Sequence, residues 1–275
     1  MQKKIAVIND LSGYGRCSLT VAIPVLSAMG HQCCPIPTAI LSNHTEFPVY
    51  FFDDYTEKMT TYTDKWKELG LSFDAIATGF LGSEAQIGIV MEIVQKLKAE
   101  KTFVVVDPVM GDHGHAYETY TPEMCEQMKE LVCMADVVLP NVTECCILTD
   151  TPYREENWTR KELLNMAMML RLMGAKSVVI TGVREGSCYT NVVLEQGQYD
   201  AKFIRTMSSG GERPGTGDVF SSVVAGALLN GKSLPEAVSQ AAGFVKECIK
   251  VSDEEQIPHA NGVCFEKILG KLIKK

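Results

Sequence analysis

Hydrophobic positions follow two alternating patterns along this chain. Short apolar runs rich in β-branched residues are typical of strands buried on both faces, whereas longer runs with a period of about 3.6 residues are typical of helices. The first pattern predicts strands at 5–8, 33–40, 75–78, 103–106, 137–139 and 178–181, and the second predicts helices at 19–29, 84–97, 123–132 and 161–172. This alternation predicts an α/β fold around a mostly parallel sheet.

The pattern changes in the last third of the chain. Two strand-like runs between 192 and 204 flank Gly197, which predicts a hairpin, and a long helical region follows over 218–249. A last helix is expected near 263–273. No repeat or linker-like stretch divides the sequence, so residues 1–275 are expected to form one domain.

The composition narrows the class of protein. A formal net charge of −8 argues against a general nucleic-acid binder, which needs a basic face to neutralise phosphates. No apolar stretch is long enough to span a bilayer, and no signal-like segment precedes the first strand-like run. The ten cysteines show no Cys-x-x-Cys spacing and are interpreted as buried thiols of a reducing compartment. We expect a cytoplasmic protein that contacts neither nucleic acid nor a membrane.

Polar clusters follow several of the predicted strands. They occupy residues 9–15, 79–83, 107–112 and 140–144. In an open α/β sheet, ligands bind outside the carboxyl ends of the strands, so clusters that end successive strands converge on one cleft. The sequence therefore predicts one ligand site built from distant segments.

The strongest candidate for chemistry is Gly215-Thr216-Gly217-Asp218, at the start of an apolar helical run. Glycines let the backbone approach a ligand, and the free N–H groups of a helix N-terminus attract an anion. A carboxylate beside such an anion site repels phosphate but can accept the proton of a hydroxyl that attacks it. Asp218 could equally complement the helix dipole, so the residues alone leave both roles open.

The run from Gly226 to Ser233 matches the Walker A pattern of P-loop nucleotide hydrolases. A P-loop follows a strand, whereas this run continues a helical stretch. Asn230-Gly231 is typical of a helix end, and Ser233 with Glu236 is typical of a capping box that starts the next helix. The match is therefore interpreted as a helix-to-helix turn.

Carboxylates after two predicted strands indicate a metal. Asp107 and Asp112 suit a hydrated magnesium ion, which prefers one or two carboxylates plus phosphate oxygens, and Glu144 could reach the same ion through water. Glu144 could also simply complement a helix dipole. The run from Asp112 to His115 holds two histidines, but a glycine-containing loop seldom fixes zinc geometry, and a flexible loop over the cleft is the preferred interpretation.

Together these motifs resemble those of the ribokinase-like superfamily and, within it, the pyridoxal kinase family. Gly215-Thr216-Gly217-Asp218 is similar to the superfamily's anion hole and catalytic base, and Asn141-Val142-Thr143-Glu144 to its Asn-x-x-Glu magnesium motif. Leu41-Ser42-Asn43-His44-Thr45 is similar to the Phe-Ser-Asn-His-Thr segment of pyridoxal kinases, and residues 107–112 to their Asp-Pro-Val-x-Gly-Asp. The motifs span nearly the whole chain in the order of the family.

The resemblance implies a fold and an activity. The fold would be a three-layer α/β/α sandwich around a mostly parallel sheet, in a protein that is usually a homodimer. The activity would be transfer of the γ-phosphoryl group of magnesium ATP to the 5′-hydroxyl of a vitamin B6 vitamer (pyridoxal, pyridoxine or pyridoxamine), a step of pyridoxal 5′-phosphate salvage. A monovalent cation such as K⁺ is a candidate for a further cofactor.

The resemblance also assigns roles to residues. Asp218 would be the catalytic base, and Gly215, Thr216 and Gly217 would form the anion hole. Tyr120 corresponds to the tyrosine of the loop over ATP. The implied substrate contacts are Asp10, Ser12, His44 and Thr45; the implied ATP contacts are Asp107, Asp112, Tyr120, Asn141, Thr181 and Gly182, the last two at a strand end; and the implied metal shell is Asp107 and Glu144.

One loop departs from the pyridoxal kinase pattern. Asp10 stands where many of these kinases carry serine, and residues 10–15 are closer to the loop of hydroxymethylpyrimidine kinases. A carboxylate can pair with a protonated pyridine or with an aminopyrimidine, so this loop leaves both substrates open. The segment Asn43-His44-Thr45 favours vitamin B6, with hydroxymethylpyrimidine kinase as the alternative. A non-catalytic vitamin-binding protein is disfavoured because Asp218 and the glycine turn are both present.

Overall fold

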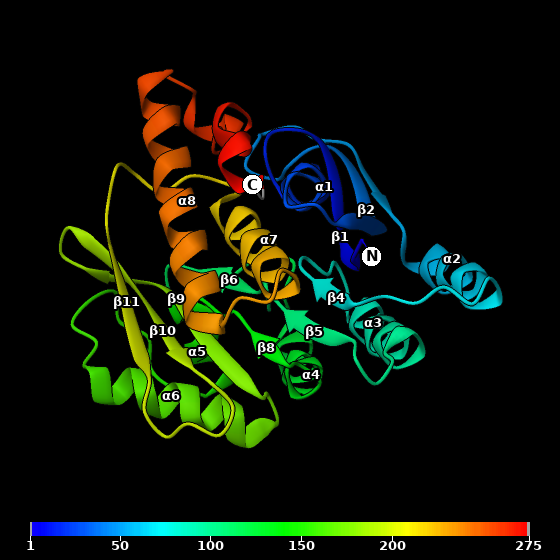
Figure 1. Cartoon of the computed structure of the whole chain (residues 1–275), viewed down its shortest axis with the longest axis horizontal. Coiled ribbons are helices and arrows are strands. Elements are labelled where there is room, and N and C mark those ends of the chain that lie inside the picture. The colour runs from blue at the N-terminus through cyan, green and yellow to red at the C-terminus, as the bar shows by residue number, and fades with distance from the viewer. Residues whose placement is uncertain (1, 274–275) are drawn as a thin grey trace.

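A nine-stranded sheet forms the centre of the molecule (Figure 1). The computed structural model of the chain describes residues 2–273. The strands of the sheet are β1 Lys4–Tyr14, β2 Gln32–Asn43, β3 Phe52–Asp54, β4 Ala75–Thr78, β5 Phe103–Val106, β8 Val137–Val138, β9 Ser177–Glu185, β10 Cys188–Leu194 and β11 Lys202–Met207. Their order across the sheet is β11-β10-β9-β8-β5-β4-β1-β2-β3.

The middle of the sheet is parallel. From β2 through β1, β4, β5 and β8 to β9, each pair of neighbours runs in the same direction. Antiparallel pairing is confined to β3 at one edge and to β10 and β11 at the other. The expected mostly parallel sheet is therefore confirmed, and the predicted hairpin around Gly197 is the connection between β10 and β11.

Helices cover both faces of the sheet (Figure 1). Side chains alternate along a strand, so Ile5 and Val7 of β1 lie in one apolar layer while Ala6 and Ile8 lie in the other. The layer of Ile5 contains α1 Ser18–Ala28, α7 Thr216–Leu229 and α8 Leu234–Glu254; the layer of Ala6 contains α2 Thr56–Glu68, α3 Glu84–Leu97, α4 Pro122–Cys133, α5 Val142–Leu148 and α6 Arg160–Met173. The three-layer α/β/α architecture is confirmed.

Small elements complete the chain. The strands β6 (Gly111–Asp112) and β7 (His115–Ala116) form a separate two-stranded hairpin directly after β5. The C-terminal segment contains the 3₁₀ helices η1 (His259–Asn261) and η2 (Glu266–Leu272). The last helix, expected near 263–273, is thus a shorter 3₁₀ helix.

The regular elements of the sheet were predicted most closely. The bounds of β4, β5 and α3 agree with the sequence pattern residue for residue. The prediction for β1 was too short, because the strand continues through polar residues that pair with β2 as far as Tyr14 opposite Asn43. Helix α2 was missed because only Met59 and Thr63 of it are buried, which leaves too few apolar positions to show a helical period.

The long helical region splits at the Walker-like run, as its capping residues indicate. Helix α7 ends before Asn230, Gly231 has a φ of 84°, and Ser233 with Glu236 forms the capping box of α8. The Lys232 ammonium donates to Gln240 Oε1 at 2.7 Å on the exposed surface. This run follows a helix and not a strand, so it is not a P-loop.

Two further findings concern residues 2–273. Over that range no helix combines the length and the apolar character that crossing a membrane requires. All ten cysteines lie within it and are free thiols.

We expect Lys232→Ala to leave phosphoryl-transfer activity within about twofold of wild type, because surface substitutions of this kind shift free energies by only about 0.5 kcal/mol. In a P-loop the lysine contacts the transferred phosphates, and its loss would abolish activity. The measurements are the rate of ADP release and the melting temperature. A large loss of rate at an unchanged melting temperature would contradict the helix-turn interpretation.

Candidate active site

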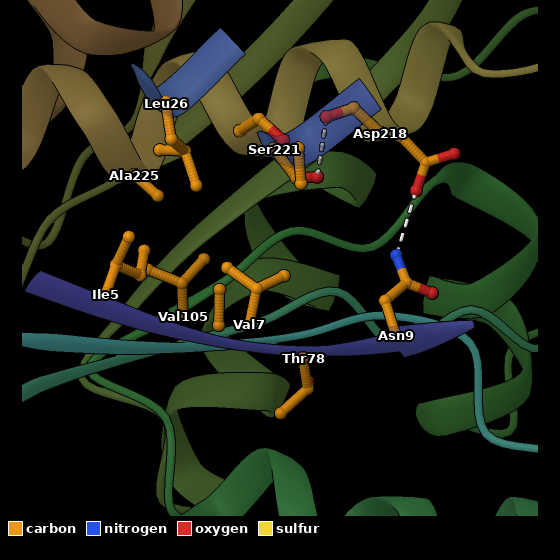
Figure 2. Close-up of a pocket in the computed structure, with 12 residues that line it drawn as sticks. Ile5, Val7, Asn9, Leu26, Thr78, Val105, Asp218, Ser221 and Ala225 are labelled. Carbon is orange, nitrogen blue, oxygen red and sulfur yellow. Dashed lines mark hydrogen bonds between the residues drawn. The ribbon is translucent and has the colours of Figure 1, made fainter. Parts of the chain in front are cut away.

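The polar clusters that follow the parallel strands meet at one edge of the sheet. Asn9, in the middle of β1, donates through Nδ2 to Asp218 Oδ1 in the first turn of α7, at 3.1 Å (Figure 2). This bond joins residues that are 209 positions apart in the sequence. Asp107, directly after β5, is close enough to Asp218 for the charge of Asp218 to act on it. The expected convergence on a single cleft is therefore present around Asp218.

The glycine turn before Asp218 leaves the start of α7 open. Gly215 is the N-cap residue, with a φ of 77°, and no side chain caps the helix. The Thr216 hydroxyl donates instead to Arg213 O at 3.0 Å. A Cβ on Gly217 would meet no atom within 4 Å among the described residues. The first-turn amides of α7 thus face open space in which an anion can approach them.

The opposite side of the turn is packed against the loop that joins β1 to α1. A Cβ on Gly215 would lie 1.7 Å from Arg16 O, so only glycine fits there. The Arg16 guanidinium bonds Asn261 O at 3.0 Å and Glu266 Oε1 at 2.6 Å. The C-terminal segment therefore holds the β1–α1 loop against the anion-binding turn.

Carboxylates crowd the floor of the cleft. Burial raises the pKa of Asp107 to about 8, and the nearby charge of Asp218 adds to this, while a hydrogen bond from Ser221 opposes it. Burial likewise raises the pKa of Asp218 to about 6, opposed by the Ser18 amide and the Asn9 side chain. The pKa of Glu144 is raised by burial and by Asp107. These three groups carry their charges more easily when a cation lies among them.

The donor set fits a hydrated divalent cation. Both Glu144 oxygens already accept backbone N–H groups, from Met110 at 3.2 Å and from Asn141 at 2.7 Å, so Glu144 would reach a metal through water. Asn141 and Glu144 also form the capping box of α5, which gives the Asn-x-x-Glu pattern a structural role. Within residues 2–273, no three His, Cys, Asp or Glu side chains could hold a metal by themselves. Magnesium shared with phosphate oxygens meets these conditions.

Asp10 is held by two serine hydroxyls. Ser12 donates to Asp10 Oδ2 at 2.8 Å, and Ser18 donates to Oδ1. Burial raises the pKa of Asp10, and these hydroxyls oppose the rise. Ser12 itself is only 1% exposed. The Ser12 hydroxyl thus supports Asp10, and its expected contact with a substrate stays a prediction.

His44 and Thr45 lie beside the β1–α1 loop. The His44 ring is buried, with Nε2 2.7 Å from Ala260 O, and it packs so closely on Gly15 that a Cβ there would lie 2.3 Å from the ring. The charge of His44 acts on Asp10, which shows that the two side chains are neighbours. Thr45 is exposed. The residues expected to bind the substrate thus gather near Asp218, with Thr45 at the surface.

The residues expected to bind ATP lie on the other side of the acidic cluster. Asn141 pairs with Thr181 in an isolated bridge and donates through Nδ2 to Gly111 O at 2.9 Å. Gly182 has a φ of 66° and donates to Asn191 Oδ1 at 3.2 Å. Strand β9 continues to Glu185, so Thr181 and Gly182 do not end a strand, although parallel pairing stops near them. Asp112 is exposed on the β6–β7 hairpin.

Two tyrosines of the loop between β7 and α4 lie near the acidic cluster. Tyr120, the expected one, is 6% exposed and packs in the core with Met124, and its pKa is raised by burial and by the charges of Glu144 and Asp107. Tyr117 is 42% exposed, and its pKa is raised by burial of its hydroxyl and by the charges of Glu144, Asp112, Asp107 and Asp218. The role of Tyr120 over ATP stays a prediction, and Tyr117 is a second candidate for it.

Two residues at the site carried no clear signal in the sequence. Asn9 was visible only as one member of a polar cluster. Ser18 has a φ of 53°, a strained conformation for a residue other than glycine, and it serves Asp10 with its hydroxyl and Asp218 with its amide. Positive φ at a serine leaves no trace in residue type, so only the structure reveals it.

Known proteins are similar to this chain in sequence and in fold. The family model described as phosphomethylpyrimidine kinase matches residues 22–264. The chain belongs to this family of kinases. A family protein from Bacteroides thetaiotaomicron, described as a phosphomethylpyrimidine kinase, is 39% identical, and its structure covers 100% of this chain and 95% of its own, with a TM-score of 0.96.

Other relatives are named for vitamin B6. A second crystal form of the Bacteroides thetaiotaomicron protein contains pyridoxal; it is 39% identical, covers 99% and 96% of the two chains and has a TM-score of 0.94. The pyridoxal kinase of Lactobacillus plantarum is 27% identical over 99% and 97% of the chains, with a TM-score of 0.91. The pyridoxine/pyridoxal/pyridoxamine kinase of Bordetella avium is 26% identical over 89% of this chain and 84% of its own. The resemblance to pyridoxal kinases is confirmed.

We expect Gly217→Val to lower kcat by about 10²–10³-fold, the usual loss when an oxyanion-type donor is blocked. Because its Cβ would point into open space, the melting temperature should change little. Gly88→Val in α3 is the matched control, since that helical glycine also faces open space. Early melting of Gly217→Val with an unchanged rate per folded molecule would make the glycine structural.

A second expectation concerns pH. Folding raises the pKa of Asp218 from 3.8 to about 6, so this group stabilises the folded state fully at pH values below 3.8. That stabilisation is lost as the pH rises through about 6. Asp218→Asn removes the disfavoured charge, so in metal-free buffer it should raise the free energy of unfolding by on the order of 1–3 kcal/mol at pH 8, by about half as much at pH 5, and by almost nothing at about pH 3. The exposed Asp150→Asn is the control. Equal pH dependence of both variants would contradict the assigned burial of Asp218.

Proposed function

We propose that this kinase phosphorylates the 5′-hydroxymethyl group of a vitamin B6 vitamer, with ATP as the phosphoryl donor. The observation that carries the proposal is Asp218, half-buried in the first turn of α7 and directly after the open turn of Gly215 to Gly217. The 39% identical relative crystallised with pyridoxal supports the choice of vitamin.

Asp218 acts as the general base. A pKa near 6 leaves its carboxyl group ionised at neutral pH, yet basic enough to accept a proton efficiently. It takes the proton of the substrate hydroxyl as that oxygen forms a bond to the γ-phosphorus of ATP. The bond between the γ-phosphorus and the bridging oxygen breaks, the electron pair leaves with ADP, and the proton stays on Asp218.

The anion-binding turn receives the charge that develops on the transferred group. The amides of Gly215, Thr216 and Gly217 face the phosphoryl oxygens. The Thr216 amide lies 3.4 Å from Arg213 O, a long hydrogen bond that a phosphoryl oxygen can replace. Fixed amide dipoles of this kind stabilise the transition state more than the ground state.

Asp107 would hold the metal directly, and Glu144 would hold it through water. Magnesium, when bound, neutralises phosphate charge and orients the leaving group. The raised pKa values of Asp107 and Glu144 support this assignment, because a cation relieves their repulsion. Asp112, Tyr117, Asn141, Thr181 and Gly182 line the nucleotide side, and K⁺ remains a candidate for a further cofactor.

Asp10 and Thr45 select the ring of the substrate. The Asp10 carboxylate, held by Ser12 and Ser18, pairs with the protonated pyridine nitrogen through a charge-assisted hydrogen bond. Thr45 offers its exposed hydroxyl to the phenolic oxygen, while His44, directly after β2, supports it. Hydroxymethylpyrimidine kinase is the second candidate, favoured by the same Asp10 carboxylate and by the name of the matching family.

A homodimer in the cytoplasm completes the proposal. The edge strand β3 and the residues before it leave Val49, Tyr50, Phe51 and Phe52 exposed, which favours contact with a second copy. The ten free thiols suit a reducing compartment.

The test is a panel of pyridoxal, pyridoxine, pyridoxamine and hydroxymethylpyrimidine with magnesium ATP, followed by ADP release. We expect the highest kcat/KM with a B6 vitamer, and Asp10→Ala and Thr45→Val should each raise its KM by roughly tenfold while that for ATP stays the same. Asp218→Asn should lower kcat by about 10²–10⁴-fold at an unchanged ATP affinity. Faster turnover of hydroxymethylpyrimidine than of every vitamer would overturn the assignment of the substrate but not that of Asp218 as the base.

A further inference from the structure

Asn9 stands where β1 leaves the hydrophobic core and the cleft begins. Its side chain is 6% exposed and makes the 3.1 Å hydrogen bond to Asp218. We propose that Asn9 is a positioning residue, which fixes the Asp218 carboxylate in the orientation needed for proton transfer. This inference rests on the proposed role of Asp218 as the base.

The strand itself aims Asn9 at the base. Alternation along β1 places Ile5 and Val7 in the layer of α1 and α7, and Asn9 continues that series (Figure 2). The register then shifts between Asn9 and Leu11, where β2 carries one extra residue and β1 continues its regular alternation. The charge of Asp10, the next residue of β1, also acts on Asp218. Two consecutive polar residues therefore serve one site.

Backbone donors fix which way the carboxamide of Asn9 points. Its Oδ1 accepts the amide of Phe80 at 2.9 Å and its neighbour's amide, that of Asp10, at 3.0 Å. Reversing the group would set its NH₂ against two N–H donors, so only one orientation satisfies all partners. In that orientation Nδ2 faces Asp218, as Figure 2 shows.

Gly79 provides the space that the carboxamide occupies. A Cβ at this position would lie 2.4 Å from Asn9 Nδ2 and 2.8 Å from Oδ1. The backbone of Gly79 has no positive φ, so conformation does not demand glycine there. Residue 79 is glycine because any side chain there would occupy the space of the Asn9 carboxamide.

A carboxamide suits this task better than an ionisable donor. It stays a donor at every pH, adds no charge to the acidic cluster and holds one carboxylate oxygen only. Figure 2 shows the other oxygen of Asp218 turned away from Asn9. Fixing one oxygen in this way limits the rotation of Asp218 and leaves the other for the substrate hydroxyl.

The first variant is Asn9→Asp, assayed with whichever alcohol of the panel is turned over fastest. It keeps the size of the side chain and the acceptors for Phe80 and Asp10, but it replaces the donor to Asp218 with a carboxylate oxygen that repels Asp218. We expect kcat to fall by about 10- to 100-fold, the usual worth of a hydrogen bond to a charged group, with KM for ATP and for the alcohol nearly unchanged.

Two other variants frame this result. Gly79→Ala displaces the Asn9 side chain without replacing it and should lower kcat in the same way, which keeps the test open if Asn9→Asp does not fold. Thr78→Val is the matched control next to it, because the buried Thr78 hydroxyl has no hydrogen-bond partner within the described part of the chain. It should leave kcat within about twofold.

The deciding measurement combines Asn9→Asp with Asp218→Asn. If Asn9 acts through Asp218, replacing Asn9 should lower kcat by less than about twofold once Asp218 is already replaced. If Asn9 has an independent structural role, its replacement should lower kcat equally in the wild-type and Asp218→Asn backgrounds. Equal losses, or a wild-type kcat in Asn9→Asp, would overturn the positioning role while the low rate of Asp218→Asn still supports the base. Wild-type kcat in Asp218→Asn alone would remove the base and the positioning role together.

Discussion

Repulsion between carboxylates in a poorly solvated cleft is the constraint on which this site depends. Parallel strands end at the same edge of a sheet, so the residues that follow β5 and β8 and the start of α7 are brought together whatever their charge. Burial and mutual repulsion raise the pKa values of Asp107, Glu144 and Asp218. Such a cluster opposes folding, and its retention is typical of a site that works on a cation and a phosphate.

The protein stabilises these charges with neutral donors. Glu144 accepts two backbone amides, Asp10 accepts two serine hydroxyls, and Asp218 accepts the Asn9 carboxamide. The nearby guanidinium of Arg16 is engaged by Glu266 and does not neutralise the cluster. Neutral donors hold each carboxylate in place without adding positive charge. The cleft can therefore accept the positive charge of a metal that arrives with the nucleotide.

The sequence predicted those parts of the fold and site that depend on residue type and local spacing. Apolar runs located β4, β5 and α3, and the glycine turn with its carboxylate pointed to Asp218. Contacts between distant residues could not be predicted in this way. The roles of Asn9 and Gly79 exist only because β1 lies between β2 and β4, and the burial of Tyr120 beside the exposed Tyr117 depends on which side of a loop meets the core.

The hydrogen bond between Asn9 and Asp218 has a consequence for synthesis of the chain, because 209 residues separate its two ends. A ribosome adds about 5–20 residues per second, so roughly 10–40 s pass between the appearance of the first strand and that of the carboxylate it contacts. During that interval β1 lacks its partners in α7, and its apolar residues Ile5 and Val7 lack the layer that covers them. The nascent protein is thus exposed to aggregation at β1, and a chaperone that shields this strand would protect the chain during the interval.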